Sequence, residues 1–221
     1  MNMDSEKNQG AIDYFHRNIN DFDDIYRDDK PGLLSFLNKT IRGSVRIRFN
    51  LAFEVLGDLT GKSVLDIGCG SGRYMFEAIK RNAARVVGLD AAAGALEKAE
   101  KLAEGFGVSD KVEFHEVEFL DFKHQNKYDI IFAVGYFDYI FNPAEHLKKM
   151  LEMSSGTIYA SFPKRWSIFS AIRKIRLSVI NKCPVRYYSK RNIKNLMREI
   201  GCDNYKINKI FRDNILIIDQ G

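Results

Sequence analysis

The sequence is poor in residues that cross-link or interrupt a chain, with 3 cysteines and 4 prolines among 221 residues. The cysteines, Cys69, Cys183 and Cys202, are odd in number and show no Cys-x-x-Cys spacing. These features exclude a disulfide scaffold and predict a reduced compartment, the cytoplasm.

Long apolar runs and an apolar leader are also lacking. No stretch approaches the roughly 18–20 apolar residues that a membrane-spanning helix needs, and the first residues, MNMDSEKNQG, are polar. We therefore expect neither a secretion signal nor a membrane span. The histidines show no metal-ligand spacing, so we expect no metal site. A composition of 45% hydrophobic and 29% charged residues predicts one globular domain with a small appendage.

Negative charge is missing from one long stretch. From Met153 to Arg198 the sequence contains no Asp or Glu, whereas Lys and Arg recur throughout. Such a block of one sign predicts either a solvated face or an anionic partner. The candidate partners are an acidic group on a small acceptor, an anionic membrane and RNA.

Strand-like and helix-like segments alternate from about residue 62 onward. The expected strands cover 63–68, 84–90, 111–117, 128–135, 156–162, 205–210 and 214–220. The expected helices cover 73–82, 92–105, 144–153 and 190–200. This alternation predicts an α/β fold with a doubly wound, mostly parallel sheet. Because only FRDN joins the last two strands, we expect them to pair as a hairpin, with the last strand antiparallel.

Two segments fall outside this alternation. Residues 1–60 show helical spacing of apolar residues and are interpreted as an N-terminal helical arm or lid, ahead of a main domain at 61–221. Residues 163–188 form a basic insertion after the fifth strand. Open α/β sheets bind ligands at the carboxyl ends of their strands, so we expect both segments to lie above that edge.

Glycine alternates with other residues directly after the first strand. The stretch VLDIGCGSGRY places Gly68, Gly70 and Gly72 behind Asp66. Glycine lets a backbone turn tightly and approach a ligand closely. The spacing differs from the G-x-G-x-x-G of dinucleotide sites. A carboxylate before the first glycine also repels a pyrophosphate and suits a ligand with an ammonium and a sulfonium.

This D-x-G-x-G-x-G pattern resembles motif I of the class I S-adenosylmethionine-dependent methyltransferases. Asp90 ends the next strand, and EFLDF follows the third, as in that family. The resemblance covers roughly residues 60–160 and 189–220. It implies a seven-stranded Rossmann-like methyltransferase sheet with an antiparallel last strand, S-adenosylmethionine as the cofactor, and methyl transfer as the reaction.

The resemblance also implies roles for individual residues. The implied cofactor-binding residues are Asp66, Gly68, Cys69, Gly70, Gly72, Asp90, Ala91, Glu118, Phe119 and Val134. Asp66 and the glycine backbone hold the methionine part, and Asp90 accepts the ribose hydroxyls. Ala91, Glu118 and Phe119 lie at the adenine, and Val134 lies near the methyl group. Cys69 is interpreted as a structural residue of the turn rather than as a nucleophile.

The segment GYFDYIFNPAEH, after the fourth strand, is where we expect the chemistry. Tyr136, Asp138 and Tyr139 are the catalytic candidates, with Asp138 as a general base or substrate anchor. Transfer from a sulfonium is an in-line displacement, which needs a base only when the nucleophile is protonated. Asn142 to Glu145 is interpreted as a capping box at a helix start.

A second, narrower resemblance concerns substrate contacts. DYFHRNINDFDDIYRDD is similar to the N-terminal arm of magnesium-protoporphyrin O-methyltransferases, which implies that Tyr14 and Tyr26 lie on a lid over the substrate. Lys164, Arg165 and Trp166, directly after the fifth strand, are candidates to receive a carboxylate or phosphate on the acceptor. Those enzymes have a histidine after strand four, where this chain has Asp138 and Tyr139.

We therefore expect a methyltransferase acting on a small, anionic or amphipathic acceptor, by O-methylation. Two alternatives stay open: an RNA methyltransferase using the basic block, and a non-catalytic cofactor-binding scaffold. No separate RNA-binding module is present, so a nucleic-acid partner is not the expectation. The mixture of basic and apolar residues in the insertion also suits peripheral contact with an anionic membrane. The oligomeric state is left open.

Overall fold

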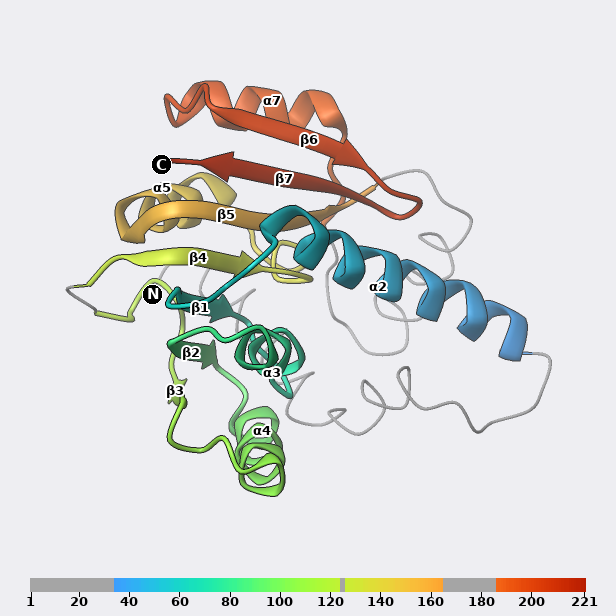
Figure 1. The fold of residues 1–221 in the computed structure, drawn as a ribbon. Coiled ribbons are helices and arrows are strands. Elements are labelled where there is room, and N and C mark those ends of the chain that lie inside the picture. Colours follow the sequence, from blue (N-terminus) through green and yellow to red (C-terminus); the bar gives the residue numbers. More distant parts are fainter. Residues whose placement is uncertain (1–33, 124–125, 165–185) are drawn as a thin grey trace.

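The computed structural model describes residues 34–123, 126–164 and 186–221, which form one sheet flanked by helices (Figure 1). Within these ranges no helix combines the length and apolar character that crossing a membrane demands. Residues 1–33 of the arm expected at 1–60, and most of the basic insertion, lie outside the described residues.

The sheet has seven strands, as predicted. They are β1 (Ser63–Ile67), β2 (Arg85–Asp90), β3 (Val112–Glu116), β4 (Tyr128–Ala133), β5 (Ser154–Pro163), β6 (Tyr205–Lys209) and β7 (Asp213–Asp219). Their order is β3-β2-β1-β4-β5-β7-β6 (Figure 1). β1 to β5 pair in parallel, while β7 is antiparallel to both β5 and β6. The doubly wound fold with an antiparallel last strand is confirmed.

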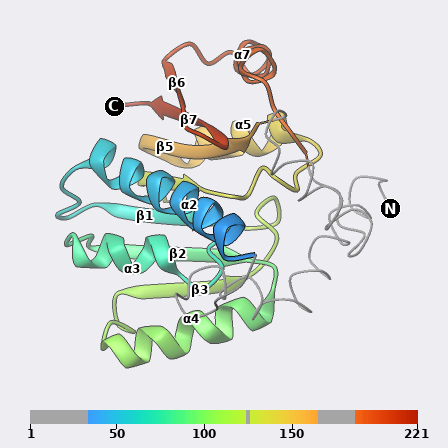
Figure 2. The ribbon, with the colours of Figure 1, turned by 90° about the vertical axis from the view of Figure 1, so that its right-hand side faces the viewer.

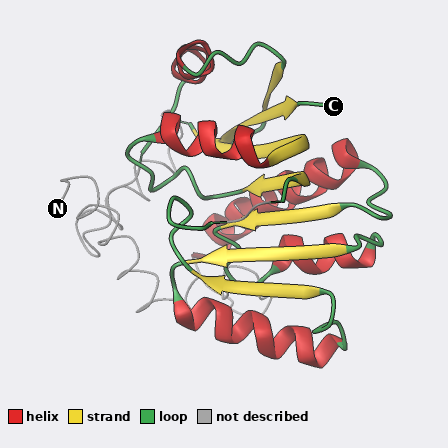
Figure 3. Ribbon diagram, turned by 90° about the vertical axis from the view of Figure 1, so that its left-hand side faces the viewer, coloured by secondary structure: helices red, strands yellow, loops and turns green. Residues whose placement is uncertain are grey.

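Helices lie on both faces of the sheet (Figure 3). They are α2 (Leu34–Leu56), α3 (Arg73–Lys80), α4 (Ala93–Phe106), α5 (Pro143–Met153) and α7 (Lys190–Glu199). Alternate strand residues face opposite layers. Val64 packs in the core that α2 and α3 share, and Leu65 in the core that α5 and α7 share. All four helices expected after residue 62 are present.

One detail of a helix start differs from the prediction. α5 begins at Pro143, but the Asn142 side chain accepts no hydrogen bond from the helix backbone. Its Nδ2 instead donates to Glu145 Oε2 at 3.0 Å. The predicted start is confirmed and the predicted capping-box bonds are wrong, since the two side chains bond each other and not the helix backbone. α7 does have a capping box, formed by Ser189 and Asn192.

Helix α2 packs across the middle of the sheet (Figure 2). The Phe53 ring lies 5.6 Å from that of Phe132 on β4, measured between centroids. The Tyr159 hydroxyl on β5 donates to the Arg48 carbonyl at 3.0 Å. The described part of the expected arm is therefore built into the same core as the sheet. The boundary at residue 60 and the lid function stay predictions.

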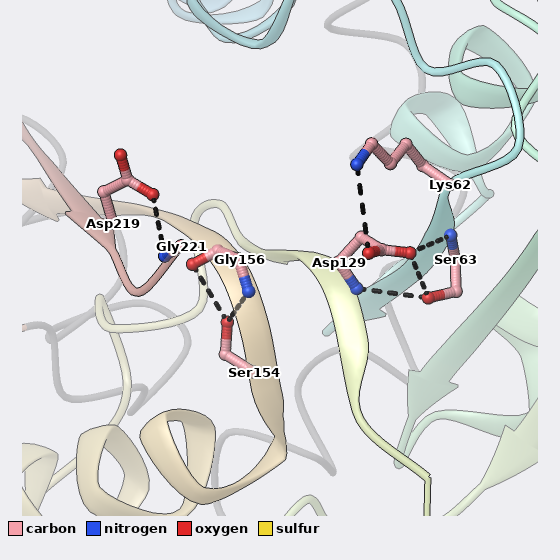
Figure 4. A network of polar contacts seen from close by, with 7 residues as sticks. All are labelled: Lys62, Ser63, Asp129, Ser154, Gly156, Asp219 and Gly221. Atoms are coloured by element: carbon pink, nitrogen blue, oxygen red, sulfur yellow. Dashed lines mark hydrogen bonds and ion pairs between the residues drawn. The ribbon is translucent and has the colours of Figure 1, made fainter.

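A polar network ties strands together at the amino edge of the sheet (Figure 4). The backbone N–H and hydroxyl of Ser63 both donate to Asp129 Oδ2, at 2.8 Å each, and so fasten the start of β1 to β4. The Ser63 bonds lower the pKa of the Asp129 carboxyl. At Gly156 an added Cβ would lie 2.4 Å from the Asp129 carbonyl oxygen, so this close approach needs glycine. These contacts are structural and lie opposite the carboxyl edge.

Candidate active site

The glycine turn after β1 adopts a backbone that explains its sequence. Gly68, Gly70 and Gly72 have φ values of 69°, 54° and 80°, in the left-handed region that L side chains avoid. The N–H groups of Gly68 and Cys69 both donate to the Leu89 carbonyl, at 2.8 and 3.0 Å. The turn therefore bends toward the end of β2 before α3 begins.

Asp66 is a buried carboxyl group at the end of β1. Its side chain is 2% exposed, and its Oδ2 meets no hydrogen-bond donor among the residues that the structure describes. Burial, and then repulsion from Asp90, raise the pKa of Asp66 to about 8. A buried carboxylate needs a partner. An ammonium group on a ligand would supply one.

Asp90, at the end of β2, joins the glycine turn to the start of α4. Its Oδ2 accepts the Gly70 N–H at 2.9 Å, and its Oδ1 accepts the Ala92 N–H at 2.9 Å. The helix that begins after Ala92 has no side-chain cap of its own, so Asp90 satisfies this donor. Each carboxylate oxygen has a second lone pair. The group can therefore still accept ligand hydroxyls.

Cys69 is packed as a structural residue. A Cβ added at Gly88 would lie 2.9 Å from the Cys69 sulfur and 2.5 Å from the Met75 sulfur, so the turn and α3 press directly on β2 here. Burial, and then the charge of Asp66, raise the pKa of the Cys69 thiol well above its usual range. A thiol held in this state is a poor nucleophile, which supports the structural interpretation.

The turn after β3 is fastened by a lysine that the sequence interpretation missed. Lys149 Nζ, from α5, donates to the carbonyls of Phe119, Leu120 and Phe122, each at 2.7 Å. Glu118 lies half-buried at the start of this turn, where burial and then Asp121 raise its pKa. Lys149 thus fixes the segment expected to meet an adenine.

Tyr136 connects the segment after β4 to the glycine turn. A Cβ at Gly68 would lie 3.1 Å from the Tyr136 ring, and the Phe119 ring meets Tyr136 edge-on with centroids 6.4 Å apart. Burial, then Glu118 and Asp90, raise the pKa of Tyr136 well above its usual range. The ring therefore lies between the glycine turn and the turn after β3.

The Tyr136 hydroxyl is hydrogen-bonded to His146 Nδ1 on α5, at 2.7 Å. Burial, and then Lys149, lower the pKa of His146 to about 4, so the imidazole is neutral at pH 7. Phenol and imidazole form a neutral pair, which makes Tyr136 a poor general base. The sequence patterns gave His146 no role beyond the lack of metal-ligand spacing among the histidines. Its spacing of three residues from Lys149 places both side chains on one face of α5, which was the available signal that they could act near each other.

Asp138 and Tyr139 are both buried, at 3% and 7% exposure. The Arg186 N–H donates to the Asp138 carbonyl at 2.8 Å, so the segment before α7 returns to this point. Burial raises the pKa of Tyr188 to about 12, with opposing contributions from Arg186 and Asp138. Asp138 thus lies near the charged Arg186 and the hydroxyl of Tyr188, beside the candidate site. Its catalytic role, like that of Tyr139, stays a prediction.

The remaining predicted site residues lie in varied surroundings. Ala91 and Val134 are half-buried just after β2 and β4. The Lys164 ammonium bonds to the Ile210 carbonyl, and burial lowers its pKa, so this side chain anchors the β6–β7 hairpin. The predicted substrate contacts Tyr14, Tyr26, Arg165 and Trp166 lie outside the described residues.

One more charged group, the guanidinium of Arg48 on α2, reaches the carboxyl edge of the sheet. Arg48 Nη1 lies 3.6 Å from Asp213 Oδ2, and its Nη2 lies 3.9 Å from where a Cβ of Gly135 would be. Ser161 Oγ accepts the Gly135 N–H at 2.8 Å. Arg48 therefore borders the segment after β4. Within the described ranges, no group of His, Cys, Asp or Glu side chains is arranged to hold a metal ion.

The fold and site together define the class. A sheet of order 3-2-1-4-5-7-6 with β7 reversed carries a glycine turn after β1 and carboxylates at the ends of β1 and β2. This is the Rossmann-like methyltransferase arrangement. Residues 58–200 match the family described as Methyltransferase domain. The chain belongs to this family, whose cofactor is S-adenosylmethionine.

Comparisons with individual proteins agree with the family. The ribosomal protein L11 methyltransferase of Escherichia coli is 45% identical over 58 residues, which are 26% of this chain and 20% of that protein. The match thus spans a fifth of that relative's length. The structure of magnesium protoporphyrin IX methyltransferase from Synechocystis with bound SAH has a TM-score of 0.77 at 16% identity, covering 97% of this chain and 100% of that one.

A second solved structure covers nearly the whole chain. The 1,6-didemethyltoxoflavin-N1-methyltransferase of Burkholderia thailandensis, with bound 1,6-didemethyltoxoflavin and S-adenosylhomocysteine, has a TM-score of 0.69 at 13% identity. It covers 99% of this chain and 91% of that one. At such low identity these two likenesses show the fold.

Proposed function

We propose that this chain binds S-adenosylmethionine at the carboxyl edge of β1 and β2 and transfers its methyl group to a small acceptor. The acceptor is anionic or amphipathic, and the methylated atom is an oxygen. One observation carries the proposal: in the part of the chain that the structure describes, Asp66 Oδ2 is buried without a donor, beside three glycines of positive φ. A ligand that brings a positive charge to bare backbone satisfies both features.

The residues present fit this cofactor in three places. Asp66 offers a carboxylate to an ammonium. No heavy atom of the described residues lies within 4 Å of where a Cβ of Gly70 would be, so backbone there can approach a ligand directly. Asp90 is held by two backbone donors and can accept ribose hydroxyls. The rings of Phe119 and Tyr136 supply apolar surface next to these polar groups.

S-adenosylmethionine, when bound, supplies an electrophilic methyl group on a sulfonium. The chain's contribution is to position the acceptor and exclude water. Tyr136 and His146 form a neutral pair, so neither is poised to take a proton at pH 7. An acceptor oxygen that is already anionic needs no such base. This supports O-methylation of an acidic acceptor, with Asp138 and Tyr139 beside it as positioning candidates.

The small-molecule assignment draws on the solved neighbours. By their names, one acts on magnesium protoporphyrin IX, and the other was solved with 1,6-didemethyltoxoflavin bound. The structural match extends over nearly all of this chain and nearly all of each neighbour. The RNA alternative depends on the basic block of 163–188, and the scaffold alternative requires that a bound cofactor is never turned over.

The test has two stages. Calorimetry with S-adenosylmethionine and with S-adenosylhomocysteine should give saturable binding, weakened in Asp66→Asn. Labelled S-adenosylmethionine is then offered with magnesium protoporphyrin IX, with 1,6-didemethyltoxoflavin and with total RNA. We expect label in a small molecule. Label in RNA alone would show that the acceptor is RNA and not a small molecule. A folded chain that binds no S-adenosylmethionine would refute the proposal.

A further inference from the structure

The turn between β6 and β7 exposes a large apolar side chain. Phe211 is 59% exposed, the highest value among the large hydrophobic residues described. A single exposed apolar residue is ordinary in itself. Its position in the fold and the charges around it therefore decide whether it has a function.

The hairpin that carries Phe211 lies at the same edge of the sheet as the glycine turn. β7 runs antiparallel to β5 and pairs Asp213 with Pro163, the last residue of β5. The Lys164 N–H donates to the Arg212 carbonyl at 2.9 Å, which fastens the turn to the end of β5. Figure 1 shows that β6 and β7 join at the end of the sheet toward which β5 points. Phe211 thus lies at the same edge of the sheet as the candidate active site, beyond the end of β5.

Exposed basic side chains surround this hairpin and the neighbouring helix. We define the hairpin edge as Phe211 with the exposed residues Lys190, Arg191, Lys194 and Lys209. α7 starts at this edge, because the Tyr188 N–H donates to the Pro163 carbonyl at 2.7 Å. The hairpin edge therefore extends, among the described residues, the basic character of the sequence from Met153 to Arg198.

Acidic side chains are placed away from the hairpin edge. Glu199 ends α7 and Asp219 ends β7, at the far ends of both elements, and Asp203 lies between α7 and β6. Asp213 is buried and paired with Arg48. Positive charge thus gathers around an exposed phenylalanine at the carboxyl edge.

We propose that the hairpin edge docks on an anionic lipid bilayer, with Phe211 entering the interface and the lysines meeting lipid headgroups. Bilayer surfaces attract Lys and Arg electrostatically, and an aromatic side chain enters the interfacial layer. Among the described residues, Phe211 is the one exposed aromatic of this edge. A single exposed ring suits insertion into a lipid interface, whereas single-stranded RNA is bound by several aromatic side chains on which successive bases stack. Docking here turns the candidate active site toward the lipid, where an amphipathic acceptor dissolves.

Vesicle sedimentation with the full chain tests this inference. The probes are vesicles of phosphatidylcholine alone and of phosphatidylcholine with phosphatidylglycerol. We expect binding only to the latter, and loss of binding when NaCl rises from about 0.1 M to about 1 M, which shortens the Debye length from roughly 10 to 3 Å. Phe211→Ser and Lys209→Glu should each lower the bound fraction, together by about fivefold or more.

Matched controls come from α4, which runs back to the amino edge of the sheet. Phe106→Ser removes a side chain that is 57% exposed, and Lys101→Glu reverses an exposed charge; both should leave vesicle binding unchanged. Equal loss in the hairpin and control variants would overturn the proposal, as would absence of binding to anionic vesicles. Salt-sensitive binding of single-stranded RNA instead of vesicles would overturn it in favour of RNA. The inference does not rest on the proposed function, because vesicle binding is measured without S-adenosylmethionine and without a methyl acceptor.

Discussion

The carboxylate of Asp90 accepts the backbone N–H of Gly70, with 2.9 Å between the two atoms. The acid that ends β2 therefore fixes the glycine turn that follows β1, in addition to its expected contact with a ribose. The proposed cofactor site is in this way a property of two adjacent strand ends rather than of one motif.

Asp90→Ala removes both the turn contact and the expected ribose contact. Two hydrogen bonds to a charged group are lost, so we expect S-adenosylmethionine binding to weaken by at least a few kcal/mol, since bonds to charged groups contribute about 1.5–3 kcal/mol each. Calorimetry measures this. Asp110→Ala, at an exposed turn position, is the control. A dissociation constant unchanged from wild type would contradict the assignment of Asp90.

Gly70→Ala separates backbone strain from ligand contact. Gly70 and Gly107 have φ values of +54° and +66°, and at neither does an atom of residues 34–123, 126–164 or 186–221 lie within 4 Å of where a Cβ would be. Alanine at either position should lower the free energy of unfolding by about 1–2 kcal/mol, the strain of a left-handed residue. Only Gly70→Ala should also weaken S-adenosylmethionine binding, by about tenfold or more. Equal affinities in the two variants would show that the turn does not face the cofactor.

Lys149→Met tests how the turn after β3 is held. The variant loses three hydrogen bonds to the carbonyls of Phe119, Leu120 and Phe122. We expect a loss of about 1–3 kcal/mol in the free energy of unfolding and weaker S-adenosylmethionine binding. Lys148→Met, at the exposed neighbouring position on α5, should change neither. Thermal denaturation and calorimetry on the pair of variants provide the comparison.

Two substitutions separate the ring of Tyr136 from its hydroxyl. Tyr136→Phe keeps the ring beside Gly68 and removes the partner of His146 Nδ1. It should retain S-adenosylmethionine binding and lose about 1–3 kcal/mol of stability through the unsatisfied imidazole. Tyr136→Ala removes the surface between the two turns and should weaken binding. Wild-type affinity in Tyr136→Ala would show that this ring is no part of the cofactor site.

The strands and helices follow the sequence closely because periodicity and glycine position determine them locally. The short FRDN connection was enough to predict the antiparallel β7, and the alternating glycines were enough to predict a tight turn after β1. The hydrogen bond from the Ala92 N–H to Asp90 at the start of α4 could not be predicted, because it depends on how the strand end and the helix meet in three dimensions.

The contacts made by α5 could not be predicted in the same way. His146 and Lys149 reach Tyr136 and the turn after β3 only because α5 packs on one face of the sheet. Lys149 and Phe119 are 30 positions apart along the chain. Arg48 reaches Asp213 across a still longer separation. Such pairs depend on tertiary packing, which residue patterns in a single sequence do not encode.

The account as a whole depends on Asp66 meeting a positive charge on the cofactor. Its pKa is raised to about 8 in the ligand-free chain, so below this pH the carboxyl must lose a proton before it can pair with an ammonium. Affinity should therefore rise with pH, by up to about tenfold per unit between about pH 6 and about 8, and level off above.

The direct measurement is calorimetric titration of S-adenosylmethionine at several pH values, in buffers of different ionisation enthalpy, for wild type and Asp66→Asn. The account predicts that wild type releases a proton on binding and that Asp66→Asn binds more weakly with no such release. A wild-type affinity that is flat across this pH range, with no proton released, would contradict it.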